Sequence, residues 1–199
     1  MKKYLLSTFA ALAAVTMASS ANAQTSYYDD MYVRVDGGYA IGMKKTEGAA
    51  IFDAGVGFRL NDYFRADVTA EWRPWGRQKF KDNGVEVGKA DMWTLGAMAN
   101  IYASYPVYDK FSVYATGGVG YSYNKTDKFK GEYKGEGKSN FAWNVGAGVE
   151  YALTPCVTLD LGYRYSDLGK AKVKSYATGA KLEEDVRYSD VKIGMQYYF

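Results

Sequence analysis

Apolar side chains recur at every second position through eight segments of this 199-residue chain, all of them after residue 30. Each segment is roughly ten residues long, which is the length and the period of a β-strand that crosses a bilayer at a tilt. The segments are Tyr32–Ile41, Ile51–Leu60, Tyr63–Arg73, Met92–Tyr102, Phe111–Tyr123, Phe141–Tyr151, Val157–Tyr165 and Asp190–Phe199. The pattern predicts an all-β chain with eight antiparallel strands.

The two faces of these segments differ in composition. One face is apolar and has no charged residue in any of the eight segments, whereas the other mixes glycine with acids and bases. The charged residues of the second face are Arg34, Asp36, Asp53, Arg59, Arg65, Asp67, Glu71, Glu150, Asp160, Arg164, Asp190 and Lys192. One Lys or Arg facing lipid at mid-bilayer costs about 2–4 kcal/mol. We therefore expect the uncharged face to meet lipid and the charged residues to form a network in the lumen.

The connections between the segments alternate in length. Asn61-Asp62 and Ala152–Cys156 are short, and Ala103–Lys110 is somewhat longer, whereas the intervening loops span 42–50, 74–91, 124–140 and 166–189. Short turns on one side and long loops on the other are typical of an up-and-down transmembrane β-barrel with an even number of strands. This arrangement places both chain termini at the periplasmic end.

A secreted, water-soluble barrel that carries a ligand alternates in the same way, with its apolar face inward. Two features favour the membrane barrel over this alternative. The polar face is rich in Gly, Arg and Asp, whereas a wetted surface is rich in Lys and Glu, and the aromatic residues gather at the two ends of the segments, as at the two interfaces of a bilayer. They are Trp72, Trp93 and Trp143 at the long-loop end, and Tyr32, Phe64, Tyr151 and Tyr197 at the other.

The first 23 residues have the three-part pattern of a secretory signal peptide. Lys2 and Lys3 precede a short apolar stretch at Leu5–Met17, and Ala21-Asn22-Ala23 supplies the small residues of a cleavage site. We expect cleavage after residue 23, export through the Sec pathway, and one barrel domain over residues 24–199.

Two stretches resemble a known group of proteins. Gly146–Gly169, which reads GAGVEYALTPCVTLDLGYRYSDLG, is similar to the small outer-membrane β-barrels of the opacity-protein and OmpA-like superfamily, whose members are also described as porin-like. The alternating end of the chain resembles the C-terminal signal that the barrel-assembly machinery reads; its residues are Val191, Ile193, Met195, Tyr197 and Phe199. The resemblance implies an outer-membrane location and a role as adhesin, surface antigen or membrane-integrity protein.

The chain contains no histidine. Ser-His and Asp-His catalysis is therefore excluded, as is zinc or haem ligation by histidine, and the single Cys156 builds no thiolate site. Asp67 and Glu71 lie four residues apart on one face, but Arg34 and Arg65 share that face, so we expect paired charges there instead of a catalytic dyad. We expect no enzyme activity, no cofactor and no metal.

The function is therefore expected at the surface, in contact with outer-membrane lipid, lipopolysaccharide or host molecules. The third long loop carries an excess of lysines that would suit a polyanion, unless they form only a solvated surface. They are Lys125, Lys128, Lys130, Lys134 and Lys138. The alternative function is a narrow channel for small solutes, although eight strands leave an interior that side chains fill. Removal of Lys2 and Lys3 with the signal peptide lowers the formal net charge from +3 to +1, which predicts no nucleic-acid partner, and we expect a monomer.

Overall fold

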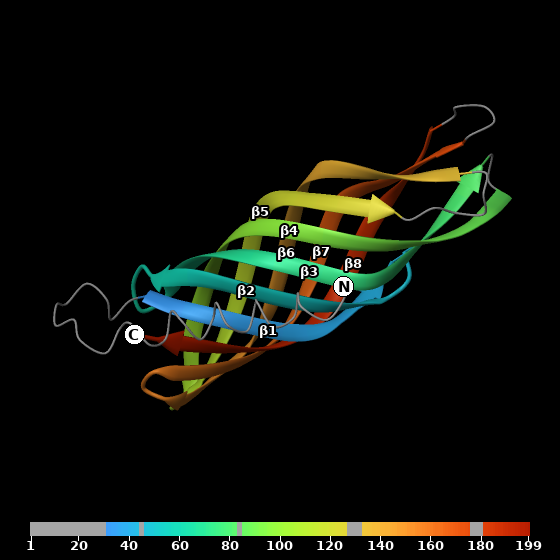
Figure 1. Cartoon of the computed structure of the whole chain (residues 1–199). Coiled ribbons are helices and arrows are strands. Elements are labelled where there is room, and N and C mark those ends of the chain that lie inside the picture. The colour runs from blue at the N-terminus through green and yellow to red at the C-terminus, as the bar shows by residue number, and fades with distance from the viewer. Residues whose placement is uncertain (1–30, 44–45, 83–84, 127–132, 176–180) are drawn as a thin grey trace, which may run out of the picture.

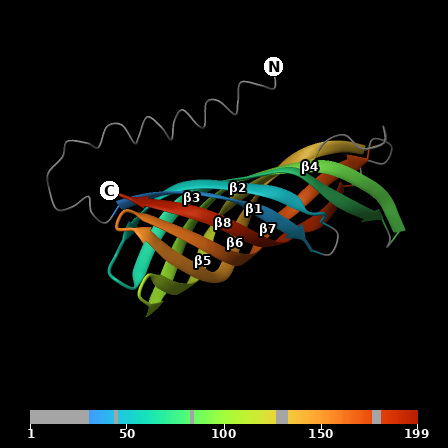
Figure 2. The same cartoon turned by 90° about the horizontal axis from the view of Figure 1, so that it is seen from below.

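The chain forms a closed β-barrel of eight strands. The structure is a computed structural model that describes residues 31–43, 46–82, 85–126, 133–175 and 181–199. The strands are β1 Met31–Gly42, β2 Ala49–Arg59, β3 Phe64–Asp82, β4 Val85–Tyr108, β5 Phe111–Thr126, β6 Tyr133–Thr154, β7 Val157–Ser175 and β8 Lys181–Tyr198. Each strand pairs antiparallel with the next, and β1 pairs with β8 to close the barrel (Figures 1 and 2). The predicted fold class is confirmed.

The predicted signal peptide, residues 1–23, lies outside the described residues and stays a prediction. Within the part of the chain that the structure describes, no helix combines the length and the hydropathy needed to cross a membrane.

The apolar face of the barrel points outward. Val56, Val68 and Ile193 expose 56%, 59% and 65% of their surface, whereas nearly all the charged residues of the opposite face are buried. A ligand-carrying barrel in water would bury the first set and expose the second. The outward apolar band therefore requires lipid around it, and the water-soluble alternative is wrong.

The strands are longer than the sequence pattern predicts. β3 and β4 stay paired as far as Asp82 and Val85, and β7 and β8 as far as Lys174 and Lys181. Most of the residues expected in the loops 74–91, 124–140 and 166–189 are strand, so that part of the prediction was wrong. The reason is that both faces of a strand meet water beyond the bilayer, so the period-two apolar pattern stops while backbone pairing continues.

The longer strands form a sheet that projects past the barrel at its long-loop end. We call it the surface extension and define it by residues 76–82, 85–91, 133–139, 167–175 and 181–187. Figure 1 shows it at the end opposite the C-terminus, reaching well beyond β1 and β2. At the periplasmic end the turns are tight, and in the β2–β3 turn the side-chain oxygen of Asn61 accepts hydrogen bonds from the backbone N–H groups of Tyr63 and Phe64.

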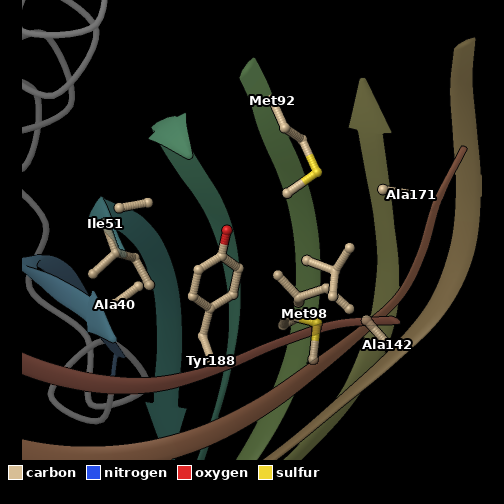
Figure 3. Packing of buried hydrophobic residues seen from close by; sticks show 10 residues of the cluster. Ala40, Ile51, Met92, Met98, Ala142, Ala171 and Tyr188 are labelled. Carbon is tan, nitrogen blue, oxygen red and sulfur yellow. The ribbon is translucent and has the colours of Figure 1, made fainter. Parts of the chain in front are cut away.

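Apolar side chains fill the lumen at the base of the surface extension, and three of them belong to it. The set, here called the apolar layer, comes from six strands and consists of Ala40, Ala49, Ile51, Met92, Met98, Ala142, Leu168, Ala171, Val186 and Tyr188 (Figure 3). Along β8 the inward residues run from Gln196 through Lys192 and Asp190 to Tyr188 and Val186. The lumen is therefore charged toward the periplasm, whereas toward the cell surface it holds apolar side chains together with neutral polar ones such as Thr94 and Asn124.

Candidate functional site

Among the described residues, twelve charged side chains are buried in the lumen, and we call this set the interior network. They are Arg34, Asp36, Asp53, Arg65, Asp67, Glu71, Arg73, Glu150, Asp160, Arg164, Asp190 and Lys192. Every second residue of a strand points inward, so the inward orientation of these side chains follows from their positions in the strands. Burial of so many charges is tolerable only when each has a partner.

The part of the interior network next to the apolar layer centres on two arginines. The Arg164 guanidinium lies 2.6 Å from Glu71 Oε1 and 3.2 Å from Asp190 Oδ2. The Arg73 guanidinium lies 2.8 Å from each of the same two carboxylates, at Glu71 Oε2 and Asp190 Oδ2. Two arginines and two acids from β3, β7 and β8 thus form a closed four-residue cluster across the lumen.

The middle of the network is built around Arg34 and Lys192. Arg34 pairs with Asp36 at 2.7 Å, with Asp67 at 3.1 Å and with Asp160 at 3.6 Å. Lys192 Nζ lies 2.5 Å from Asp53 Oδ2 and 3.4 Å from Asp36 Oδ2. Asp36 therefore joins the two cations into one continuous set of ion pairs.

At the periplasmic end the network finishes at Arg65. Its Nη2 lies 2.6 Å from Glu150 Oε1, and its Nη1 donates to Ser104 Oγ at 2.9 Å. The guanidinium also stacks 4.1 Å from the centre of the Tyr102 ring. Arg59 behaves differently, because it is exposed and lies 4.5 Å above the ring of Tyr198.

Eleven of the twelve residues expected in a lumen network are thus buried and together, and Arg59 lies at the mouth of the barrel. Sequence reasoning missed Arg73, although it continues the inward series of Arg65, Asp67 and Glu71 at every second position. Tyr32 was expected in the aromatic group at the periplasmic interface, but it is fully buried and donates to Asp67. That placement was wrong because Arg34, two residues further along β1, points inward, and Tyr32 lies on the same inward face.

Two glycines make room for an aromatic ring in the lumen. A Cβ on Gly148 would lie 2.6 Å from the ring of Tyr114, and a Cβ on Gly162 would overlap the Tyr114 hydroxyl. The ring therefore lies flat against the bare backbone of β6 and β7, and its hydroxyl points to Asp160 at 3.4 Å. The glycines of the inward face thus let large side chains fill the interior.

Asp67 and Glu71, the two carboxylates four residues apart on β3, have separate partners. Asp67 accepts from Arg34, Tyr32 and Asn100, whereas Glu71 pairs with Arg73 and Arg164. Among the described residues, no group of three or more His, Cys, Asp or Glu is arranged to hold a metal ion. Cys156 is exposed in the β6–β7 turn.

Outside the lumen, three lysines of the surface extension surround one carboxylate. Lys138 Nζ donates to Glu183 Oε1 at 2.8 Å, while Lys172 and Lys170 lie 3.8 and 3.7 Å from the same group. The hydrogen bond from Lys138, followed by the charges of the neighbouring lysines, holds the pKa of Glu183 below its ordinary value. Glu136 adds a second carboxylate 4.0 Å from Lys172. The cluster keeps an excess of positive charge.

Nearer the tip, the strand register brings further lysines together. Lys134 on β6 pairs with Lys174 on β7, which pairs with Lys181 on β8. Like charges placed directly opposite on neighbouring strands repel one another. Of the lysines expected to meet a polyanion, Lys134 and Lys138 are thus part of this sheet, Lys125 lies 5.8 Å from the Trp93 ring, and Lys128 and Lys130 lie outside the described residues.

The last strand presents its apolar series to the outside. Val191, Ile193, Met195 and Tyr197 are exposed on β8, and the ring of Phe199 packs 5.5 Å from that of Tyr197. These are the residues expected to act as the assembly signal, and they lie on the lipid-facing surface of the strand that closes the barrel against β1.

Residues 8–199 match the family model of the outer membrane protein beta-barrel domain. The chain belongs to this family. It is accordingly a β-barrel protein of the bacterial outer membrane, with its apolar band in the bilayer and its surface extension outside.

Similar proteins of this family include curated relatives and solved structures. An uncharacterised protein of Brucella abortus is 30% identical over 167 residues, which cover 69% of this chain and 58% of that protein. The chain therefore spans little more than half of that relative. A Rickettsia bellii protein named as a candidate adhesin is 28% identical, with 94% of each chain covered. The outer membrane protein OprG of Pseudomonas aeruginosa has the same fold, with a TM-score of 0.66 at 16% identity over 86% of this chain and 97% of that one.

Proposed function

We propose that this outer-membrane barrel is a surface-interaction protein without enzymatic activity, and that its surface extension contacts polyanions. The candidates are the phosphates of lipopolysaccharide around the barrel and the acidic polysaccharides of a host surface. The observation that carries the proposal is the register of Lys134, Lys174 and Lys181 across three neighbouring strands. A row of like charges is unfavourable alone, and a bound polyanion would relieve it.

The neighbouring cluster supports the same proposal. Lys138, Lys170 and Lys172 lie within ion-pair distance of Glu183, and Glu136 lies 4.0 Å from Lys172, so these contacts join three lysines to two acids. Asp185 is the register partner of Lys170 and adds a third acid beside them. A paired strand framework holds these lysines at fixed spacing, which suits a repeating anionic polymer better than a flexible loop would. The name of the Rickettsia bellii relative, a candidate adhesin, agrees with a contact at the cell surface.

The lack of enzymatic activity is part of the proposal. The chain has no histidine to act as general base, and its inward acids lie in ion pairs with arginine or lysine. A carboxylate without a basic partner in a cavity would favour acid–base chemistry. Carboxylates that form ion pairs with arginine or lysine favour a rigid interior instead.

A channel function, the alternative, has little support from the described interior. Arg34, Arg73 and Arg164 cross the lumen in ion pairs, and the apolar layer closes it toward the cell surface. Ions would have to break those pairs and enter an apolar constriction. We further propose that the barrel is a monomer and that the barrel-assembly machinery reads its last strand.

The proposal is tested by reversing the lysine row. A variant with Lys134→Glu, Lys174→Glu and Lys181→Glu is displayed on cells and compared with the wild type for binding of dextran sulfate and for attachment to host cells. The same variant is scored for detergent sensitivity, which reports contact with lipopolysaccharide. We expect weaker dextran sulfate binding with a loss of salt dependence, because the contact is electrostatic.

A matched control carries the same change of charge on the other hairpin of the surface extension. Its substitutions are Lys79→Glu, Lys81→Glu and Lys89→Glu. Loss of binding in the first variant and retention in the control supports the lysine row as the contact. Equal binding by the wild type and the first variant contradicts the proposal.

A further inference from the structure

The periplasmic mouth of the barrel contains a cavity that the surface function does not use. It has a volume of about 210 Å³ and lies among the short turns, since Asp62 of the β2–β3 turn and Lys110 of the β4–β5 turn both line it. This is the end of the barrel that holds the C-terminus (Figure 2). We infer that this cavity, here called the periplasmic pocket, binds a small phosphate-type oxyanion through Arg59 and Arg65.

The two arginines face each other across neighbouring strands. Arg59 on β2 is the direct register partner of Arg65 on β3, and both line the periplasmic pocket. Like charges in directly opposite positions repel each other, so an anion bound between or beside the two arginines would stabilise the pair. Arg65 meets one carboxylate, that of Glu150, whereas Arg164 of the interior network meets Glu71, Asp190 and Asp53.

The partners of the two arginines leave donors available for a ligand. Among the described residues, the Arg59 guanidinium has no carboxylate within ion-pair distance and lies over the Tyr198 ring, which fixes its plane. Arg65 is 5% exposed, and its Nη atoms meet Glu150 and Ser104, but its Nε has no hydrogen-bond partner in the described part of the chain. A buried guanidinium N–H without an acceptor is costly and marks a place for one.

The remaining lining fits an oxyanion. Lys110 adds a third cation, and Ser112 and Thr158 add hydroxyl donors, against the acids Asp62 and Glu150. Glu150 is already paired with Arg65 at 2.6 Å, so the pocket keeps a positive balance. The planar guanidinium fork matches the geometry of phosphate oxygens better than that of chloride or another spherical anion.

Phosphate groups reach this place from two sources. The periplasmic end of an outer-membrane barrel borders both the headgroups of the inner leaflet and the solutes of the periplasm. The apolar layer separates it from the cell surface. The chemistry of recognition is the same in both cases, so the ligand source is a question for the experiment.

The test uses the full barrel in a phosphorus-free maltoside detergent. Inorganic phosphate is titrated against the protein by calorimetry, and a short-chain phosphatidylglycerol is tested in a second arm by native mass spectrometry. Arg59 is exposed, so Arg59→Gln leaves the interior network intact, and Lys110→Gln provides a second variant in the same pocket. Arg77→Gln in the surface extension is the matched control, because Arg77 is also an exposed arginine.

We expect binding of at least one probe to the wild type and to Arg77→Gln, and a loss of about tenfold or more in affinity in Arg59→Gln, as for removal of one charged hydrogen-bonding group. Tighter binding of the lipid assigns the pocket to headgroups, and binding of inorganic phosphate alone assigns it to soluble ligands. Absence of binding by both probes, or equal affinity of the wild type and both pocket variants, overturns the inference.

Discussion

Arg164 on β7 and Glu71 on β3 form an ion pair of 2.6 Å across the full width of the barrel. Their strands lie four positions apart in either direction around the closed sheet, so no backbone ladder connects them. Both side chains are almost completely buried. The pair therefore links opposite walls of the barrel, and it does so where water is too scarce to replace a lost partner.

Removal of this link should destabilise the barrel strongly. In Arg164→Gln, Glu71 keeps Arg73, but the shared acids lose one of the cations that balance them. Breaking a buried ion pair from one side costs about 3–5 kcal/mol, and we expect a decrease of that size in the free energy of unfolding. Tryptophan fluorescence during urea unfolding in lipid vesicles measures it.

A matched variant, Asp53→Asn, compares the stability cost of losing an acid with that of losing a base. The interior network contains seven acids and five bases, and Lys192 keeps Asp36 as a partner when Asp53 is neutralised. Asp53→Asn should therefore cost clearly less than Arg164→Gln. An equal cost for the two variants would show that local packing, and not charge balance, sets the stability.

The charged interior was predictable from the sequence because the period of two is strict inside the bilayer. Once the apolar face is assigned to lipid, residues such as Asp53, Arg65 and Glu150 have only the lumen left. The specific partners were not predictable. Which base meets Asp190 depends on strand stagger and closure, since Arg73 and Arg164 come from different strands, and a single sequence does not fix the stagger.

A charge placed on the lipid face provides a direct test of the membrane boundary. Val145 is about half exposed on β6 and lies between Gly117 and Tyr165 on the neighbouring strands. Val145→Arg should lower the free energy of unfolding by about 2–4 kcal/mol, because the guanidinium would have to enter hydrocarbon. The measurement is the same urea titration in vesicles.

The control for this prediction is a more exposed residue at the rim of the barrel. Tyr108 is 76% exposed beside the β4–β5 turn, so Tyr108→Arg should change the unfolding free energy by about 0–1 kcal/mol. Similar costs at the two positions would mean that Val145 does not face lipid.

The end of the lumen near the cell surface was the least predictable part. The inward face turns apolar there at Ala40, Ile51 and Tyr188, but in the sequence these residues are hard to tell from lipid-facing ones. The pattern weakens further at Gly169, whose backbone has φ of +73° in the irregular pairing of β7 with β8. The Ser122 hydroxyl and the Asn124 amide donate to the carbonyl of Leu168 at this point, a contact between strands that are not neighbours.

The apolar layer should prevent ions from passing through the barrel. In planar bilayers we expect no steady, discrete openings from the wild type, because ions would have to shed water in a constriction that apolar side chains fill and that offers them no charged partner. Replacing Ile51 and Tyr188 by Ala removes the largest side chains of β2 and β8 from the layer, so this variant should open more often than the wild type. Regular openings of the wild type would favour the channel function instead.

Low pH should break the ion pairs between Glu183 and the neighbouring lysines of the surface extension when Glu183 becomes protonated. Lys138 holds the pKa of Glu183 below its ordinary value of 4.5, so Glu183 stays ionised and paired at pH above that value. Because the pKa is lower in the folded chain, the stabilisation is present above about pH 4.5 and disappears as the pH falls through the folded value. The carboxyl carbon shift of Glu183 in an NMR titration reports this pKa. Lys138→Met should raise it toward 4.5, and Lys125→Met on β5 should leave it in place, whereas an unchanged titration in Lys138→Met would contradict the pairing.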